Sequence, residues 1–272
     1  MSSMALRIIA IVTMLIDHMG AVLAQSNHWQ YGPFMRTVGR IAFPIFVFLI
    51  AEGMRQSKNR PKYLLWLASF AIISIIPFSM FMAVTRHGVH VPFTPISWEH
   101  TNVFFTLFLG AASIYIFDLF RNNIKIWLGI PGWILGLAAP AAAYLAADHI
   151  NSDYAGMGVA VIFATYFAMA IADIPPIKNL KFTDARIIRV IPLVIWAHVQ
   201  YSQFGAPGLI PTAIGGTGVG PFALAAAIAP ILILLYDGTP GTQRLRGRMK
   251  IIFYIFYPAH LLAIYAWSIW LR

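Results

Sequence analysis

The sequence contains no cysteine. Disulfides, thiolate nucleophiles and cysteine-ligated metal sites are therefore excluded together. Charged residues are also scarce, since they make up 10% of the 272 residues, whereas hydrophobic residues make up 60% and the mean hydropathy is +0.75. Soluble domains carry roughly 25% charged residues, so this composition indicates an integral membrane protein.

Acidic residues are the scarcer of the two charge types. The chain has 9 Asp and Glu residues against 19 Lys and Arg residues, which gives a formal net charge of +10. A basic balance can indicate nucleic-acid binding, but in a membrane protein it usually reflects Lys and Arg retained in cytoplasmic loops. We therefore expect the lipid bilayer, and not nucleic acid, as a partner of this chain.

Long apolar runs dominate the sequence, and a spanning helix needs about 20 such residues. The pattern predicts an all-α fold, a polytopic transmembrane helical bundle of about nine spans that forms a single domain over residues 1–272. Pro77 is expected to kink the third span, because proline removes a backbone hydrogen bond. The nine predicted spans are 6–24, 37–54, 63–84, 102–120, 126–146, 156–172, 190–204, 219–236 and 251–270.

The Lys and Arg residues are distributed unevenly between the loops that alternate across these spans. Of the 19, 15 fall on one side. The positive-inside rule then places the amino terminus inside and the carboxyl terminus outside. Arg36 and Arg40 stand out on the opposite, outer side, where positive charge is otherwise sparse, which suggests either function or pairing.

The first predicted span is interrupted by an ionisable pair, Asp17 and His18. Such groups cost about 2.5–3.5 kcal/mol each at the bilayer centre on insertion scales, so they are rarely found there without a function. Their presence inside the run also argues against a cleaved signal peptide. We expect His18 to act as a general base. The alternative is structural, with Asp17 in an ion pair with Arg40 and His18 as a core imidazole.

Counting along the helices predicts which residues share a depth with this pair. At 1.5 Å per residue, His18 lies about 18 Å along the first span, beyond the midplane and level with Arg40. The same counting predicts an outer-half polar cluster, and its candidate substrate-binding residues are Arg36, His100, Asn102 and His260. No HExxH motif or close ligand pair occurs within the spans, so no metal site is expected.

Four separated blocks of the chain carry a family resemblance. They read LRIIAIVTMLIDHMGAV, GRIAFPIFVFLIAEG, TNVFFTLFLG and KIIFYIFYPAHLLAIY, and together they resemble the TraX family. The resemblance implies a multi-pass protein of the bacterial inner membrane that acetylates the amino terminus of a conjugative pilin, or a similar envelope acceptor, with acetyl-CoA as the donor.

On this resemblance we expect three catalytic residues. His18 would take the acceptor proton, and Asp17 would orient the site or balance its charge. The oxyanion would be stabilised by Arg40 or, as the alternative, by His100 and Asn102. A basic run is most simply a topology determinant that contacts anionic lipid, but it would also receive the nucleotide end of coenzyme A. Its members are Arg244, Arg246, Arg248 and Lys250.

Two other function classes stay open from the sequence. In a transporter or flippase, Asp17, His18 and Arg40 would form an intramembrane relay for protons or substrate. In an assembly factor, the bundle would only hold pilin or another small membrane protein. Binding of the acetyl donor would separate an enzyme from both.

Overall fold

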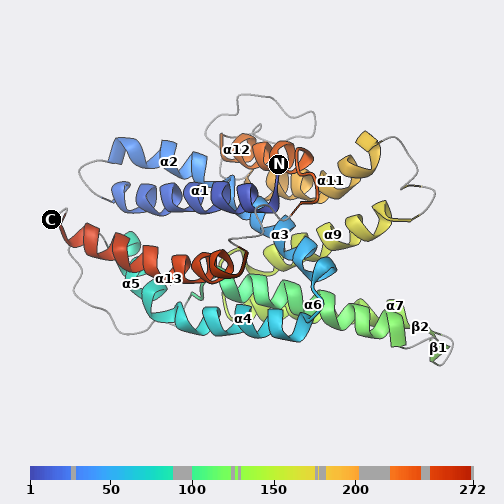
Figure 1. The fold of residues 1–272 in the computed structure, drawn as a ribbon. Coiled ribbons are helices and arrows are strands. Elements are labelled where there is room, and N and C mark those ends of the chain that lie inside the picture. Colours follow the sequence, from blue (N-terminus) through green and yellow to red (C-terminus); the bar gives the residue numbers. More distant parts are fainter. Residues whose placement is uncertain are drawn as a thin grey trace.

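A computed structural model of the chain describes residues 1–25, 29–87, 100–123, 126–127, 130–174, 177, 182–201, 221–239 and 246–270. Apart from one small hairpin, these residues are helical (Figure 1). The first elements are α1 (Ser3–Leu23), the short 3-10 helix η1 (Trp29–Tyr31), α2 (Gly32–Gly39), α3 (Ala42–Gln56), α4 (Arg60–Ile73), α5 (Ile75–His87) and α6 (Val103–Asn123). The antiparallel strands β1 (Ile126–Trp127) and β2 (Ile130–Pro131) follow, and then α7 (Gly132–Gly136), α8 (Ala138–His149), α9 (Ala155–Ala172), α11 (Phe182–Tyr201), α12 (Pro221–Leu234) and α13 (Arg246–Trp270).

Within the described ranges, five helices are long and apolar enough to cross a membrane. They are Ser3–Leu23, Gly32–Gln56, Val103–Asn122, Ala155–Ala172 and Ile251–Trp270. The pair α4 and α5 passes the same test jointly but is bent by 48°, and would make a sixth span. The expectation of an all-helical membrane protein is confirmed, whereas the number of nine spans and the orientation of the termini stay predictions.

Two predicted spans differ in detail from the observed helices. The kink expected from Pro77 is present, since the third span is bent by 48° at Ser74. The break lies one turn before Pro77, because the missing Pro77 N–H leaves the Ile73 carbonyl without its helical hydrogen-bond partner. The predicted span 126–146 begins as the β1–β2 hairpin and continues as two short helices, because glycine and proline interrupt it repeatedly. These interrupting residues are Pro131, Gly132, Gly136 and Pro140.

Helix α3 lies at the centre of the bundle. Ten of its fifteen residues are buried, and it packs against α1, α6, α9 and α12. In Figure 1 it lies between α1, α2, α11 and α12 on one side and α4, α5 and α6 on the other. A helix that is apolar on all sides is stable only when it is surrounded, so the sequence of α3 accounts for its place.

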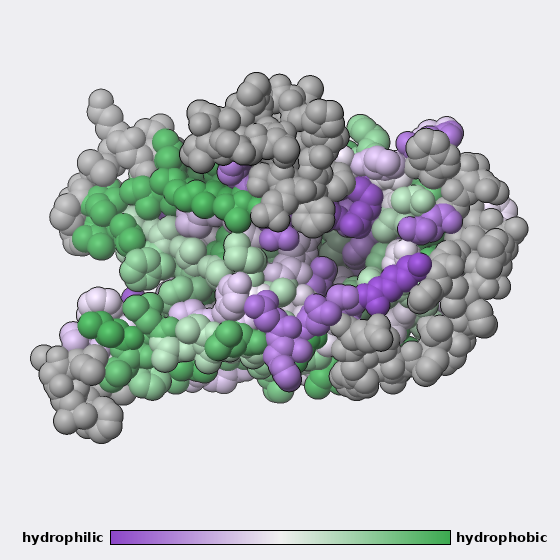
Figure 2. Space-filling model, turned by 180° about the vertical axis from the view of Figure 1, so that it is seen from behind, coloured by the Kyte–Doolittle hydropathy of each residue, from purple (hydrophilic) through white to green (hydrophobic). Residues whose placement is uncertain are grey.

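The outer faces of the helices remain apolar. Large hydrophobic side chains are exposed on α1, α4, α11 and α13, among them Val12, Leu65, Ile195 and Ile252. Exposed apolar area of this extent needs a nonaqueous partner, and lipid provides one. Figure 2, which views the molecule from behind, shows hydrophilic residues gathered toward one end while the other end is largely hydrophobic.

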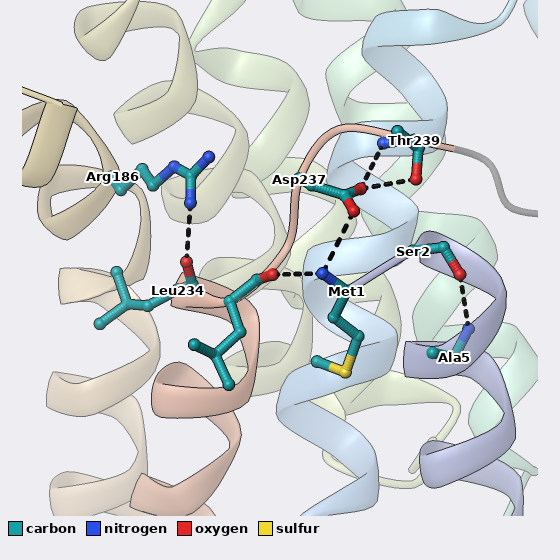
Figure 3. Close-up of polar contacts among 8 residues, drawn as sticks. Met1, Ser2, Ala5, Arg186, Leu234, Asp237 and Thr239 are labelled. Carbon is teal, nitrogen blue, oxygen red and sulfur yellow. Dashed lines mark hydrogen bonds and ion pairs between the residues drawn. The ribbon is translucent and has the colours of Figure 1, made fainter.

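The start of α1 is tied to the segment after α12 (Figure 3). The Met1 ammonium donates to the Leu235 carbonyl at 2.6 Å and pairs with the Asp237 carboxylate at 3.2 Å. The Asp237 carboxylate also accepts from the hydroxyl and the backbone N–H of Thr239, and these contacts lower the pKa of Asp237 to about 2. Two backbone hydrogen bonds, from Asp237 to Met1 and from Ser3 to Thr239, complete the contact.

Candidate functional site

Two glycines allow α1 and α2 to approach each other closely. A Cβ atom on Gly39 would lie 2.1 Å from the Asp17 Cβ, and one on Gly20 would lie 2.6 Å from the Met35 Cβ. No side chain fits at these distances, and small residues are what lets membrane helices pack this tightly. The close contact at Gly39 brings Asp17 within reach of Arg36 and Arg40, which lie on either side of Gly39 in the sequence.

Asp17 forms an ion pair with each of these two arginines. Its Oδ2 accepts from the Arg36 Nη1 at 2.8 Å, and its Oδ1 accepts from the Arg40 Nη2. Arg40 also donates from its Nε to the Arg36 carbonyl at 3.1 Å. Asp17 and Arg40 are buried, so each charge is stabilised by its partner. The structure thus brings together three of the residues singled out from the sequence.

His18 is hydrogen bonded to His260 of α13. The His18 Nδ1 lies 2.7 Å from the His260 Nε2, and the two rings are within 11° of parallel. The His260 Nδ1 lies 2.8 Å from the carbonyl oxygen of Phe256.

These contacts determine where the protons lie when both rings are neutral. A carbonyl oxygen only accepts, so the His260 Nδ1 carries a proton and the His260 Nε2 accepts one. His18 must then donate from its Nδ1, which leaves the lone pair on its Nε2. Among the described residues this nitrogen has no hydrogen-bond partner. The arrangement therefore presents His18 as a base with a defined tautomer.

A cavity of about 320 Å³ opens beside these groups. Its walls come from α1, α2, α3, α5 and α13 and from the segments that precede α6 and α9. Its titratable or hydroxyl-bearing lining residues are Asp17, His18, Arg36, Arg40, Thr85, His100, Thr101, Asp153, Tyr154 and Tyr257. The volume lies at the lower end of the roughly 300–1,000 Å³ typical of small-molecule sites. A base, two guanidinium groups and a second carboxyl group thus line one space.

Asn102 has a structural role instead of the expected contact with substrate. It is fully buried, donates from its Nδ2 to the Ala71 carbonyl at 2.8 Å, and accepts at its Oδ1 from the Phe104 N–H at 3.0 Å. The second contact caps the start of α6. Asn102 is not among the cavity-lining residues, so its amide holds α6 in place and is not available to a ligand.

The predicted coenzyme A contacts cannot be placed at the cavity. Arg244 lies outside the described residues, and for Arg246, Arg248 and Lys250 the structure describes only the helical backbone at the start of α13. Their contact with a nucleotide stays a prediction. In the part of the chain that the structure describes, no group of three or more His, Asp or Glu side chains could hold a metal ion.

Tyr257 and Asp153 are among the cavity residues that were not predicted from the sequence. Tyr257 is buried, and its hydroxyl has no acceptor among the described residues. Asp153 stands in the turn between α8 and α9, where its side chain is exposed to the cavity. The enclosing cavity walls limit its contact with bulk water, and this desolvation raises the pKa of its carboxyl to about 6. The sequence around Asp153 reads as an ordinary polar turn, and a tyrosine inside a span reads as core, so neither carried a signal.

Comparison with known proteins places the chain in one family. It is 26% identical over 260 residues to the probable fimbrial assembly protein FimC, serogroup H1, of Dichelobacter nodosus, and the match covers 96% of this chain and 93% of that protein. No solved structure matches the chain significantly. The family model described as TraX protein matches residues 2–268, so the chain belongs to the TraX family.

Proposed function

We propose that this protein is a membrane-embedded acetyltransferase that transfers an acetyl group from acetyl-CoA to the N-terminal amine of a pilin or a similar envelope acceptor. We place this activity in the bacterial inner membrane. The observation that carries the proposal is the His18–His260 hydrogen bond at the wall of the cavity. When both rings are neutral, it leaves the lone pair of the His18 Nε2 without a partner among the described residues. Membership of the TraX family and the fimbrial assembly name of a relative support an acceptor of the pilin type.

His18 would act as the general base. As the acceptor nitrogen attacks the thioester carbonyl carbon, the His18 Nε2 would take a proton from that nitrogen. When the carbon–sulfur bond breaks, the same proton would pass to the departing thiolate. A correctly placed base of this kind contributes about 10²–10⁴-fold to a rate.

His260 would be a positioning residue for His18. Its Nε2 accepts the His18 Nδ1–H, and its own Nδ1 is held by the Phe256 carbonyl. This contact keeps the basic nitrogen of His18 from exchanging places with the protonated one. It also stabilises the imidazolium that forms when His18 takes up the proton, as an oriented acceptor does in other catalytic histidine pairs.

The negative charge that develops on the carbonyl oxygen needs a donor. Arg36 and Arg40 line the cavity and share a single carboxylate, Asp17, so the three side chains together carry one positive charge in excess. The Tyr257 hydroxyl is a second candidate donor, because Tyr257 lines the cavity and its buried hydroxyl has no acceptor among the described residues. Groups fixed in this way stabilise an oxyanion without reorganising.

The cavity would hold only the reacting end of the donor. Arg246, at the start of α13, precedes Tyr257 by eleven positions on the same helix, a separation of about 16 Å. The nucleotide end of coenzyme A would bind Arg244, Arg246, Arg248 and Lys250, with its extended arm reaching along α13 to the cavity.

The test is acetyl transfer by purified protein. Labelled acetyl-CoA is supplied with a peptide that has the free N-terminus of a candidate pilin. We expect His18→Ala to lower the rate by about 10²–10⁴-fold, because it removes the base. His198→Ala is the matched control, since His198 is exposed on α11 and does not line the cavity.

Full transfer by His18→Ala would show that His18 is not the base. Absence of transfer by the wild-type protein, with substrate flux across proteoliposomes instead, would favour a transporter. Binding of the peptide without binding of acetyl-CoA would favour an assembly factor.

A further inference from the structure

The turn between α8 and α9, which carries Asp153, has an uncommon backbone conformation on both sides of this residue. Three residues other than glycine have positive φ values here: Asn151 (48°), Tyr154 (66°) and Ala155 (45°). Side chains disfavour this region, and clusters of such residues persist only where the surrounding structure imposes them. Strain of this kind occurs preferentially at functional sites.

The surrounding structure clamps the turn from the start of α6. Thr101 pairs with the turn through two backbone hydrogen bonds, from the Asp153 N–H at 2.9 Å and to the Asn151 carbonyl at 3.2 Å. The Thr106 hydroxyl contacts both the Asp153 carbonyl and the Ser152 hydroxyl. All of these contacts hold the backbone and leave the Asp153 side chain free to face the cavity.

An aromatic stack fixes the next residue. The Tyr154 ring lies on the Phe43 ring, with centroids 3.6 Å apart and planes within 9° of parallel, and Trp196 packs at the edge of both. Tyr154 is therefore fixed to α3, and the carboxyl group of Asp153 is held at a defined place on the cavity wall.

The Asp153 carboxyl is accessible and forms no ion pair with any described residue. It is exposed where it lines the cavity. The charged or titratable groups that share the cavity with it come from α1, α2 and its C-terminus, α13 and the segments before α6 and α9. They are Asp17, His18, Arg36, Arg40, His100, Tyr154 and Tyr257. The arginines are engaged with Asp17, so the Asp153 carboxyl remains open to a ligand.

The aromatic part of the cavity wall suits an ammonium group next to this carboxyl, and Asp17 partly balances the charge of Arg36 and Arg40. Its aromatic members are Phe43, Phe46, Phe78, Phe81, Tyr154 and Tyr257. The faces of aromatic rings attract an ammonium group, and a carboxylate provides its charge-assisted hydrogen bond. Carboxylate and aromatic rings together are the chemistry that recognises an alkylammonium.

We propose that Asp153 binds the acceptor through a primary ammonium group, so that the cavity selects amine acceptors over hydroxyl acceptors. This inference rests on the proposed acyl transfer and adds the residue that determines the acceptor class. One proton of the bound ammonium leaves to Asp153 or to water before attack. The second is taken by His18 during attack and delivered to the thiolate, so the protons balance.

Binding of two matched peptides without acetyl-CoA tests the inference. The peptides have the same sequence, and one has an N-terminal amine where the other has a hydroxyl. We expect the wild-type protein to prefer the amine, and we expect Asp153→Asn to weaken amine binding about tenfold or more while leaving hydroxyl binding unchanged. Asp148→Asn is the control, because Asp148 lies at the end of α8, next to this turn, and its carboxylate accepts from the Gly156 N–H at 2.7 Å without lining the cavity.

A pH series on the wild-type protein gives a second readout that needs no variant. The Asp153 carboxyl is neutral below its pKa of about 6 and charged above it, so amine binding should strengthen as the pH rises through this value, and hydroxyl binding should not. Amine binding that is flat with pH, or equal loss of both peptides in Asp153→Asn, would show that Asp153 is only a counter-ion of the arginines. Amine preference without acetyl transfer would count against the acetyltransferase and not against Asp153.

Discussion

Three aspartates in the described part of the chain are each bridged by two arginines, but only one of them lines the cavity. Asp17 pairs with Arg36 and Arg40 beside the two histidines, Asp118 pairs with Arg60 and Arg121, and Asp173 pairs with Arg55 and Arg189. The same ion-pair pattern thus occurs at three places. What distinguishes Asp17 is the open space next to it, so the pairing by itself is not a sign of function.

The Asp118 cluster is the buried counterpart. The Asp118 side chain is 3% exposed, and it accepts from Arg60 at 2.6 Å and from the Tyr166 hydroxyl, with Arg121 at 3.0 Å. These partners belong to α4, α6 and α9, so the cluster ties three helices together. None of its residues lines the cavity beside Asp17, and no histidine is among its described partners, so we interpret it as structural.

The largest expected effect on stability comes from Asp118→Asn. The substitution removes the negative charge from between two arginines, and breaking a buried pair in this way costs about 3–5 kcal/mol. We expect the thermal unfolding temperature in detergent to fall strongly, while acetyl transfer per folded molecule stays at the wild-type level. Loss of transfer in the protein that remains folded would show that Asp118 also serves the site.

Asp17→Asn tests the comparison with Asp118, because it removes the carboxylate from the same kind of ion-pair cluster where that cluster lines the cavity. The Asp17 side chain is 10% exposed, so a loss of stability of about 3 kcal/mol is expected here too. Transfer per folded molecule should also fall, by about 10²-fold, since Arg36 and Arg40 lose the group that orients them toward the oxyanion. Unchanged transfer at saturating acceptor would mean that the pair is as structural as the one at Asp118.

Gly39→Ala tests whether the site depends on the close contact of α1 and α2. The new Cβ would lie 2.1 Å from the Asp17 Cβ, so the helices must separate, at a cost of about 1–3 kcal/mol. Gly53→Ala is the control, because its Cβ would meet the Tyr63 hydroxyl at 2.9 Å, the end of a side chain that can move. Equal unfolding temperatures for the two variants would contradict this account.

The smallest effect is expected from Asp173→Asn. This side chain is 36% exposed, and a pair open to solvent contributes about 1 kcal/mol or less, with screening by salt. We expect a small decrease in the unfolding temperature at low salt and almost none at high salt, with transfer unchanged. A decrease as large as that of Asp118→Asn would show that the exposure of the aspartate side chain does not determine how much each ion pair stabilises the protein.

Composition and hydropathy were enough to predict a helical membrane protein, because burial in lipid leaves little choice of residue type. Pro77 predicted the kink between α4 and α5, but nothing in the pattern predicted that Ile126–Trp127 pairs with Ile130–Pro131 as two short strands. Hydropathy averages over a window, whereas a break depends on individual turn-forming residues and on the neighbours that satisfy the freed backbone groups.

Within the site, the sequence by itself determined the unusual residues and not their partners. Asp17 and His18 could be recognised because an ionisable group inside an apolar run is costly wherever it packs, and Arg36 and Arg40 because they break the charge asymmetry of the loops. Only the tertiary structure decided that Asp17 meets both arginines next to Gly39 and that His260 orients His18. It also decided that Asn102 caps a helix and that Asp153 lines the cavity from a turn. Those contacts join residues from distant parts of the chain, and no local pattern encodes the distance between them.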